Sequence, residues 1–175
     1  IFCGLEQLIE YIKTLHFSTE DIEYLRSLNT FSDGFLEYLK TFKFSGDIYS
    51  VEEGNFVFPN EPLVVVRANI IEAQIIETAL LAIVNGAMEH ATGARRIIEA
   101  TPKGVGVMEF GARRAHNMDA AVYGARASYI GGASGTATVL AGQLFGIPVS
   151  GTMAHSWVMY YKDEYTAFKN YAENY

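Results

Sequence analysis

The last third of the chain alternates short apolar segments with helical ones, and this order restricts the fold more than any other feature. Val105–Phe110 and Ile147–Ser150 are apolar enough to be buried strands, and Tyr129–Gly131 is a shorter strand candidate. Helical patterns follow them, at residues 119–127, at 136–145 and from 156 onward. A strand–helix–strand order requires parallel strands joined by helical crossovers. We therefore predict an α/β arrangement for this part of the chain.

About three such units fit before Tyr175, whereas a closed barrel contains about eight. Either the rest of a barrel lies beyond Tyr175 in a longer protein, or the sheet is small and open. The chain opens on Ile1 without an initiator Met, and Tyr175 falls inside an amphipathic helical pattern. We therefore expect a fragment that contains the first βα units of an irregular, TIM-like barrel.

Residues before this part have a mixed pattern. Apolar residues at helical spacing predict helices near residues 5–15, 18–28 and 35–42, and Ser18 followed by Asp21 resembles a capping box that opens the second. Segments rich in Phe, Val and Ile, punctuated by Gly, Asn and Pro, predict a small antiparallel sheet with strands at 48–51, 56–58 and 63–66.

The helical period returns from Ile70 to Ala100, with a break expected at Asn85-Gly86. Helices and an antiparallel sheet in succession are typical of an α+β region. We therefore divide the chain into an N-terminal mixed helix/sheet region, residues 1–100, and the start of the α/β barrel, residues 101–175.

Charge and cysteine content exclude several classes of protein. A net charge of −7 argues against a protein that binds the phosphate backbone of nucleic acids. It leaves room for a small anionic ligand, which needs only a few cations or backbone N–H groups. The single cysteine, Cys3, excludes an internal disulfide and multi-cysteine metal sites. A reducing, cytoplasmic compartment is therefore the default. No uninterrupted apolar run approaches the roughly 18–20 residues of a membrane span, so we expect no membrane partner.

Polar or glycine-rich residues follow each predicted strand of the last third. Glu109–Arg114 follow the first strand, Gly131–Thr136 the second and Ser150–Ser156 the third. In parallel α/β proteins the carboxyl ends of the strands form the ligand-binding face. The three segments are therefore expected to converge on one pocket.

Four features of these segments indicate chemistry, and each has a plainer alternative. Arg113 can hold a phosphate or carboxylate through two parallel hydrogen bonds, or form an ordinary salt bridge. The glycine-rich loop can bring N–H groups to an anion, or simply turn the chain. Thr152 offers a hydroxyl to a ligand or a cap to a helix. His155 can act as a nucleophile or acid–base group, or be structural.

Other catalytic patterns are missing. His16 and His90 are poorer candidates, whereas His116 could line the same pocket. No two histidines stand at i, i+4 with an acidic partner, so a zinc site is not expected. The chain has no P-loop, and Ser134 and Ser150 lack the G-x-S-x-G context of an esterase.

Several longer blocks resemble the nicotinate phosphoribosyltransferase family. They are EFGARRA at 109–115, YIGG at 129–132 and LAGQLFGIPVSGTMAHSWV at 140–158. Upstream, FPNEPL at 58–63, ETALL at 77–81 and the first eight residues are similar as well, so the resemblance covers nearly the whole chain in order. Its most specific part is the Gly-Thr-x-Ala-His motif after a Gly-Ile-Pro strand, which makes His155 the leading candidate.

The resemblance implies a defined reaction. The family transfers phosphoribose from phosphoribosyl diphosphate to the ring nitrogen of nicotinate, which gives nicotinate mononucleotide and diphosphate in NAD salvage. ATP hydrolysis is coupled to this transfer through a transient phosphohistidine. The resemblance also implies Mg²⁺ as cofactor, ATP as co-substrate and a homodimer with shared active sites.

Residue roles follow from the same resemblance. His155 is expected to be phosphorylated, Thr152 to contact nicotinate, and Arg113 to hold an anionic group of substrate or product. Phe110 matches an aromatic residue that stacks on the pyridine ring in the related nicotinamide enzyme. The expected substrate-binding set is completed by the loop residues Ser134, Gly135 and Thr136.

The sequence also departs from the family pattern. Ser134 stands where relatives often carry an acidic residue, and His116 where they often carry glutamine. The family's N-terminal Thr-Asp-Leu-Tyr segment and later barrel strands are absent. Two alternatives stay open: a non-catalytic fragment or interaction module, and a sister phosphoribosyltransferase that acts on nicotinamide or quinolinate. The Gly-Thr-Met-Ala-His motif favours the nicotinate branch.

Overall fold

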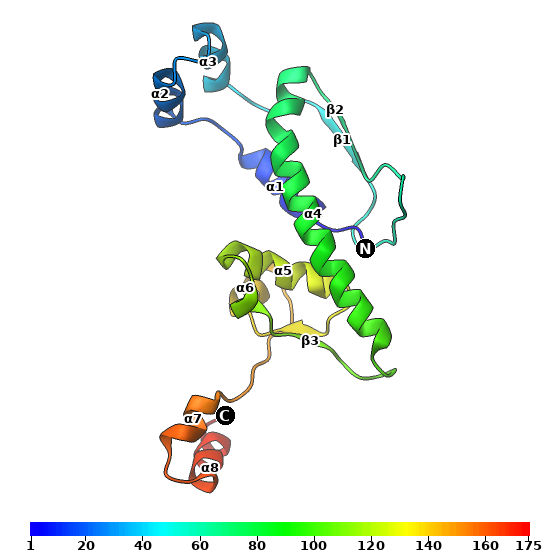
Figure 1. Cartoon of the computed structure of the whole chain (residues 1–175), viewed down its shortest axis with the longest axis vertical. Coiled ribbons are helices and arrows are strands. Elements are labelled where there is room, and N and C mark those ends of the chain that lie inside the picture. Colours follow the sequence, from blue (N-terminus) through cyan, green and yellow to red (C-terminus); the bar gives the residue numbers. More distant parts are fainter.

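The computed structural model describes all residues, 1–175. The molecule is elongated, and smaller helices gather around and beyond a long central helix (Figure 1). Its elements in chain order are α1 (Leu5–Thr14), α2 (Thr19–Ser27), α3 (Asp33–Lys40), β1 (Asp47–Ser50), β2 (Val64–Arg67), α4 (Ile70–Ala100), β3 (Met108–Glu109), η1 (Ala112–Arg114), α5 (Met118–Ile130), β4 (Gly135–Thr136), α6 (Val139–Phe145), α7 (His155–Tyr160) and α8 (Glu164–Asn174). The fold is therefore a mixed, mainly helical one with two small sheets.

Serine residues fix the starts of α2 and α3. Ser18 and Asp21 form a reciprocal capping box at α2, and the Ser32 hydroxyl accepts a hydrogen bond from the Phe35 N–H at α3. The apolar faces of the two helices enclose a small core of Ile22, Leu36, Leu39 and Phe42. The three helices expected in this region are confirmed.

β1 and β2 form a two-stranded antiparallel sheet in which Asp47 lies opposite Arg67. The expected antiparallel sheet is confirmed, but its predicted middle strand at residues 56–58 is wrong. Gly54 and Asn60 have positive φ angles of 89° and 69°, so the chain turns at both ends of this segment. The two phenylalanines of the segment are consequently exposed.

α4 runs unbroken for 31 residues, so the break expected at Asn85-Gly86 is wrong. A Cβ atom on Gly86 would meet nothing within 4 Å, so close packing does not explain this glycine, whereas the neighbouring Val84 and Ala87 contact the N-terminal segment. Gly4 has a φ angle of 106° and lies against this turn of α4. A Cβ atom on Gly4 would approach the Val84 Cα and the Ala87 Cβ at 3.1 Å. The N-terminal segment therefore needs a glycine here both for its conformation and for its fit on α4.

α4 is the one helix long and apolar enough to cross a membrane by length and composition alone. In this structure it packs against α1 and α5. It also buries Ile76, Val84 and Ala91 completely or nearly so. α4 is thus the central helix of this fold, although only 22% of its most apolar window is buried.

A buried carboxylate fixes the start of α4. Glu72 is 3% exposed and accepts hydrogen bonds from the Ser45 N–H and hydroxyl, at 2.7 and 3.0 Å, and from the Asn69 amide. The Asn69 side chain in turn caps the helix by accepting from the Glu72 N–H at 3.0 Å. The bond from the Ser45 N–H outweighs the opposing effect of burial, and the pKa of Glu72 is lowered.

Replacing Glu72 by glutamine is expected to cost about 1–3 kcal/mol, because the amide has a single acceptor oxygen where the carboxylate has two. The pKa of Glu72 is lower in the folded than in the unfolded protein. Its stabilisation is therefore present above the unfolded-state pKa and is lost as pH falls through the folded-state pKa. Urea unfolding of both proteins at neutral pH and at steps below pH 4.5, the ordinary value for glutamate, measures this.

The difference in unfolding free energy between the unmodified protein and Glu72→Gln should become smaller as the pH falls. Glu23→Gln, at an exposed position on α2, is the matched control and should show little gap at any pH. A Glu72→Gln gap that stays constant as pH falls would contradict the assignment.

A second carboxylate joins the N-terminal segment to α5. Glu53 pairs with Arg126 through two hydrogen bonds of 3.0 and 2.7 Å, and both side chains are 17% exposed. Glu53 also accepts from the N–H groups of Gly4 and Leu5 at 2.6 and 3.0 Å. Burial alone would raise the pKa of Glu53, but the bonds from Arg126 and the backbone outweigh it and lower the pKa. The Arg126 guanidinium also lies over the ring of Phe145 in α6.

Cys3 is fully buried beside this ion pair, in a cluster with Ala91 and Ala127. Burial and the neighbouring Glu53 charge raise the pKa of its thiol to about 12. The cluster joins the first residues to α4 and α5, so they are an integral part of the fold.

β3 and β4 pair in parallel, with Met108 opposite Gly135 and Glu109 opposite Thr136. Thr136 also forms a parallel bridge to Val149. α5 and α6 connect these segments in the chain. The expected parallel strands with helical crossovers are confirmed, although the strands are shorter than predicted, and the barrel stays a prediction.

The strand expected at Tyr129–Gly131 is wrong, because Tyr129 and Ile130 end α5. The Gly131 N–H continues the helical pattern by donating to the Ala127 carbonyl at 2.9 Å. Gly132, with a φ angle of 111°, then turns the chain, and the strand begins at Gly135. A short apolar run cannot by itself distinguish a helix end from a strand.

Residues 151–175 form a C-terminal arm at the far end of the molecule, reached through an extended segment (Figure 1). Its two helices are joined by Trp157, whose ring N–H donates to the Ala167 carbonyl at 3.0 Å and whose ring contacts Tyr161 and Tyr171. The helix expected from residue 156 onward is present but divided in two, because Asp163 caps a new helix, α8.

Candidate active site

The carboxyl ends of three parallel segments meet at one edge of the fold. The Ala137 N–H donates to the Glu109 carbonyl, and the Thr136 N–H donates to the Pro148 carbonyl, both at 3.0 Å. The Ser150 N–H donates to the Thr136 carbonyl at 3.1 Å. The three strand ends are therefore side by side, as the strand–helix order predicts.

Glu109 links two of these ends through its side chain. The Thr136 hydroxyl donates to the Glu109 Oε2 atom at 2.6 Å, and the Gly111 N–H donates to Oε1. The Thr136 hydroxyl also accepts from the Thr138 N–H at 2.9 Å, and Thr136 is fully buried. Sequence reasoning missed Glu109. The available signal was an acidic residue at the end of an apolar strand, a position that needs partners once buried.

Backbone hydrogen bonds and close packing hold the glycine-rich loop before β4 against the rest of the protein at several positions. The N–H groups of Ala133 and Ser134 donate to the carbonyls of Ser128 and Val107, at 3.0 and 2.7 Å. Gly135 is buried, and a Cβ atom there would lie 2.5 Å from the Pro148 carbonyl. Ser134 is exposed, so it is the loop side chain that a ligand can reach.

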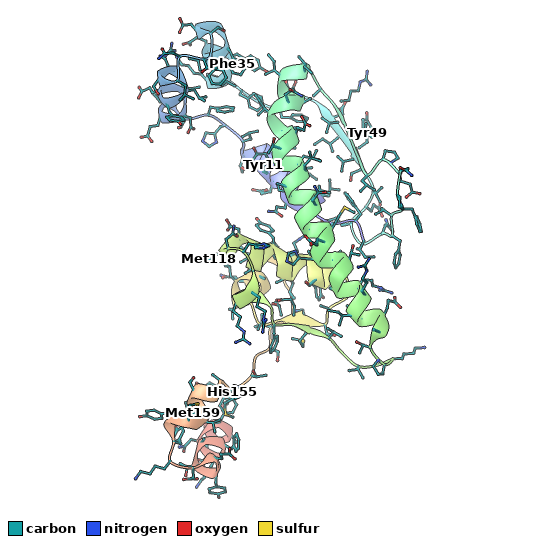
Figure 2. The ribbon with its side chains drawn as sticks, in the orientation of Figure 1. Tyr11, Phe35, Tyr49, Met118, His155 and Met159 are labelled. Carbon is teal, nitrogen blue, oxygen red and sulfur yellow. The ribbon has the colours of Figure 1, made fainter.

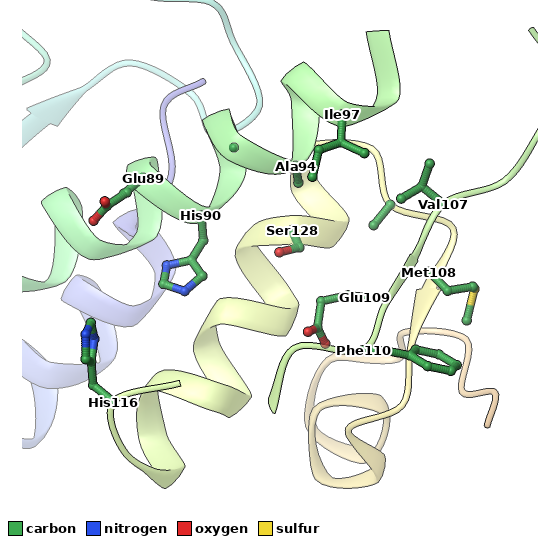
Figure 3. Close-up of a pocket in the computed structure, with 12 residues that line it drawn as sticks. Glu89, His90, Ala94, Ile97, Val107, Met108, Glu109, Phe110, His116 and Ser128 are labelled. Atoms are coloured by element: carbon green, nitrogen blue, oxygen red, sulfur yellow. The ribbon is translucent and has the colours of Figure 1, made fainter. Parts of the chain in front are cut away.

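A cavity of about 500 Å³ opens beside β3, between α4 and α5 (Figure 3). Glu109 and Phe110 line it from the end of β3, His90 from α4 and His116 from the segment before α5. Figure 3 shows the Glu109 side chain extending from the strand on the side of α5, whereas the Phe110 ring extends on the opposite side. The cavity therefore combines apolar walls with two carboxylates, of Glu89 and Glu109, and two imidazoles.

Arg113 lies in the short 3-10 helix η1 that directly follows β3, and it is exposed. It takes part in none of the salt bridges of the chain. Its guanidinium is therefore available to an anion that approaches the strand ends. The salt-bridge alternative considered for this residue is not seen within the chain.

Thr152 and His155 lie on the C-terminal arm. His155 is exposed and is the first residue of α7, so its expected place at a helix start is confirmed. Figure 2 shows it beyond the extended segment that leaves the strand ends. Thr152 lines a second cavity of about 440 Å³, whose walls include Trp157 and Tyr171.

The predicted site residues thus form two groups. Phe110, Arg113 and residues 134–136 lie at the strand ends, whereas Thr152 and His155 lie on the arm (Figures 1 and 2). The structure brings together the three strand ends but does not bring the arm against them. Thr152 lies within the extended residues 151–154, which carry the chain away from the strand ends to His155 at the start of α7. The expected convergence of all three segments on one pocket is therefore wrong for the third segment.

Comparison with known proteins relates both groups to one family. The chain matches the model of the nicotinate phosphoribosyltransferase N-terminal domain over residues 1–85. It matches the model of the nicotinate phosphoribosyltransferase family over residues 105–174. The two matches follow each other in order and cover the first half of α4, to residue 85, and the strand ends.

Individual relatives agree with these matches. The nicotinate phosphoribosyltransferase of Bacillus subtilis is 51% identical over 173 residues, which cover 99% of this chain and 35% of that protein. One from Mycobacterium tuberculosis is 44% identical over 172 residues, covering 98% and 37%. The crystal structure of human nicotinic acid phosphoribosyltransferase matches with a TM-score of 0.85 at 31% identity, covering 91% of this chain and 33% of that one.

The chain spans about a third of the length of the curated relatives it matches. Within that third, the likeness is continuous in both sequence and fold. The chain therefore belongs to the nicotinate phosphoribosyltransferase family.

Proposed function

We propose that the protein to which these residues belong transfers phosphoribose from phosphoribosyl diphosphate to nicotinate, in the cytoplasm, as a step of NAD salvage. The observation that carries this proposal is the 51% identity, over 99% of the chain, to a protein named nicotinate phosphoribosyltransferase. The parallel strand ends with an unpaired arginine support it, because such an edge suits an anionic substrate.

The roles of the strand-end residues follow from their placement. Arg113, exposed and unpaired, holds an anionic group of substrate or product. Phe110, 42% exposed beside the cavity, stacks on the pyridine ring. Ser134 reaches the substrate from the loop, and the buried Gly135 and Thr136 shape the floor beneath it.

The two arm residues supply the remaining roles. Thr152 contacts nicotinate through its hydroxyl, and His155 accepts the γ-phosphoryl group of ATP. A ring nitrogen of His155 forms a bond to phosphorus, the bond from that phosphorus to the β-phosphate oxygen breaks, ADP leaves and a proton is lost from the imidazole. The exposed position of His155 at a helix start suits this transfer.

The transfer of phosphoribose makes one bond and breaks one bond. The ring nitrogen of nicotinate bonds to C1 of the ribose as the bond from C1 to diphosphate breaks. Charge separates in an oxocarbenium-like transition state, so positioning and fixed charges supply most of the catalysis. Phosphorylation of His155 adds about two negative charges, by analogy with other phosphorylated side chains.

Mg²⁺ is assigned to the diphosphate of the substrate rather than to the chain. No group of three or more His, Cys, Asp or Glu side chains gathers in the structure to hold a metal ion. Mg²⁺ is commonly bound through substrate phosphates with only one or two carboxylates. The residues present therefore form no metal cage of their own.

We also propose a homodimer. Exposed apolar side chains on α4, among them Ile70, Leu81 and Ile97, support it, because such surface is commonly covered by further protein. Sedimentation of the full-length protein tests it directly.

Turnover of three pyridine substrates by the full-length protein tests the proposed function. Nicotinate should be converted at least about 100-fold more efficiently than nicotinamide, because a site built for a carboxylate leaves charges unpaired against an amide. ATP should stimulate the nicotinate reaction. Preference for nicotinamide or quinolinate would indicate a sister enzyme, and absence of turnover on all three would indicate a non-catalytic module.

A further inference from the structure

We propose that Glu109 is a positioning residue: its carboxylate fastens the segment that carries Phe110 and Arg113 to β4, and so holds both side chains at the strand ends. The inference rests on the proposed function, since Phe110 and Arg113 are there assigned to the substrate. It adds a residue that acts through others and touches no reacting atom.

The carboxylate makes a bond on each side. Oε2 accepts from the Thr136 hydroxyl at 2.6 Å, and Oε1 accepts from the Gly111 N–H. One bond leads to a fully buried residue of the neighbouring strand, and the other to the first turn of the exposed segment. Glu109 is thus the side-chain link between a rigid strand and residues 110–114.

The direction of these hydrogen bonds requires an acceptor with two oxygens. The Thr136 hydroxyl accepts from the Thr138 N–H at 2.9 Å, so its own proton is free to donate to Glu109. The Gly111 N–H can only donate. A glutamine at position 109 would offer one acceptor oxygen. If that oxygen stayed on the Gly111 N–H, the NH₂ group would donate to the Thr136 hydroxyl, and the hydroxyl proton would lose its acceptor.

The residue at position 111 allows this close approach. A Cβ atom on Gly111 would lie 2.9 Å from the Glu109 Oε1 atom, so any side chain there would push the carboxylate aside. Gly111 has a φ angle of −91°, which other residues adopt easily. The glycine is therefore required for contact with Glu109 rather than for its own backbone conformation.

The Phe110 and Arg113 side chains are largely exposed, although the backbone of η1 lies against α5. Phe110 is 42% exposed, and Arg113 is exposed and forms no salt bridge. Binding groups that are not fixed by packing depend on neighbouring hydrogen bonds for their placement. Figure 3 shows the Glu109 carboxylate turned away from the Phe110 ring. The two side chains therefore lie on opposite sides of the strand.

Kinetics of the full-length protein test the proposal. Glu109→Gln, Thr136→Val and Gly111→Ala should each raise KM for nicotinate by about tenfold to a hundredfold, because displaced binding groups weaken binding, with a much smaller change in kcat. Thr136→Ser keeps the hydroxyl and should restore KM. Val122→Ala, which opens a cavity in the same core cluster, is the control for general destabilisation and should leave KM unchanged.

Hydrogen exchange provides a readout that needs no turnover. The amides of residues 111–115 should exchange faster in Glu109→Gln than in the unmodified protein and in Val122→Ala. Unchanged KM and unchanged exchange in Glu109→Gln, or a failure of Thr136→Ser to restore KM, would overturn the proposal. If the unmodified protein does not turn over nicotinate, the proposed function is overturned instead. Hydrogen exchange of residues 111–115 would then be the test of the positioning role of Glu109.

Discussion

The His155→Asn variant of the full-length protein is expected to lose ATP-stimulated turnover and phosphoryl incorporation completely. Asparagine is similar in polarity to histidine, but its amide nitrogen is not nucleophilic and cannot accept a phosphoryl group. Because His155 is exposed on the arm and makes no side-chain hydrogen bond there, its loss should leave folding unchanged. Formation of nicotinate mononucleotide with and without ATP measures the first effect, and transfer of label from γ-labelled ATP measures the second.

His16→Asn is the matched control, because His16 is also exposed and lies outside both groups of site residues. It should keep full labelling and full stimulation. The His155→Asn protein should retain the rate that the unmodified protein shows without ATP. Labelling or stimulation that persists in His155→Asn would remove the phosphohistidine from this position.

Arg126→Met is expected to reduce the free energy of unfolding by about 3 kcal/mol, because it leaves the largely buried Glu53 carboxylate without its cation. The destabilisation should also affect the start of α1, because Glu53 accepts hydrogen bonds from the N–H groups there. Urea unfolding of the full-length protein, followed by tryptophan fluorescence and circular dichroism, measures it.

Two further variants make this test specific. Arg95→Met removes an ion pair with Glu99 that is much more exposed and should cost under about 1 kcal/mol. Glu53→Gln combined with Arg126→Met removes both charges and should recover part of the loss. The Arg126→Met effect should also shrink in acid, because the pKa of Glu53 is lowered in the folded state and its stabilisation is lost as pH falls through that value. Equal losses for Arg126→Met and Arg95→Met would refute the structural role.

Features decided by near neighbours were predictable from the sequence. The capping box at Ser18 and Asp21 and the strand–helix order after residue 104 depend on residues close in the chain. Errors arose where a distant segment decides the outcome. Gly86 suggested a helix break, but the helix continues because the N-terminal segment packs against that turn.

The site shows the same division. Arg113 and His155 were predictable because their residue types and motif positions indicate chemistry. Glu109 was missed because its importance depends on Thr136, a partner 27 residues away that comes opposite it only when β3 and β4 pair. The separation of the arm from the strand ends was equally beyond a sequence argument, because spacing along a strand end does not fix the path of the residues that follow.

The burial of Cys3 has a chemical consequence. With a pKa of about 12, only on the order of one thiol in 100,000 is ionised at pH 7, and attack by alkylating or oxidising reagents proceeds through that ionised form. Cys3 carries the one thiol of the chain, and it does not react with such reagents while the first residues remain packed against α4. Any adduct that forms at this sulfur therefore records a moment at which the N-terminal segment had come loose.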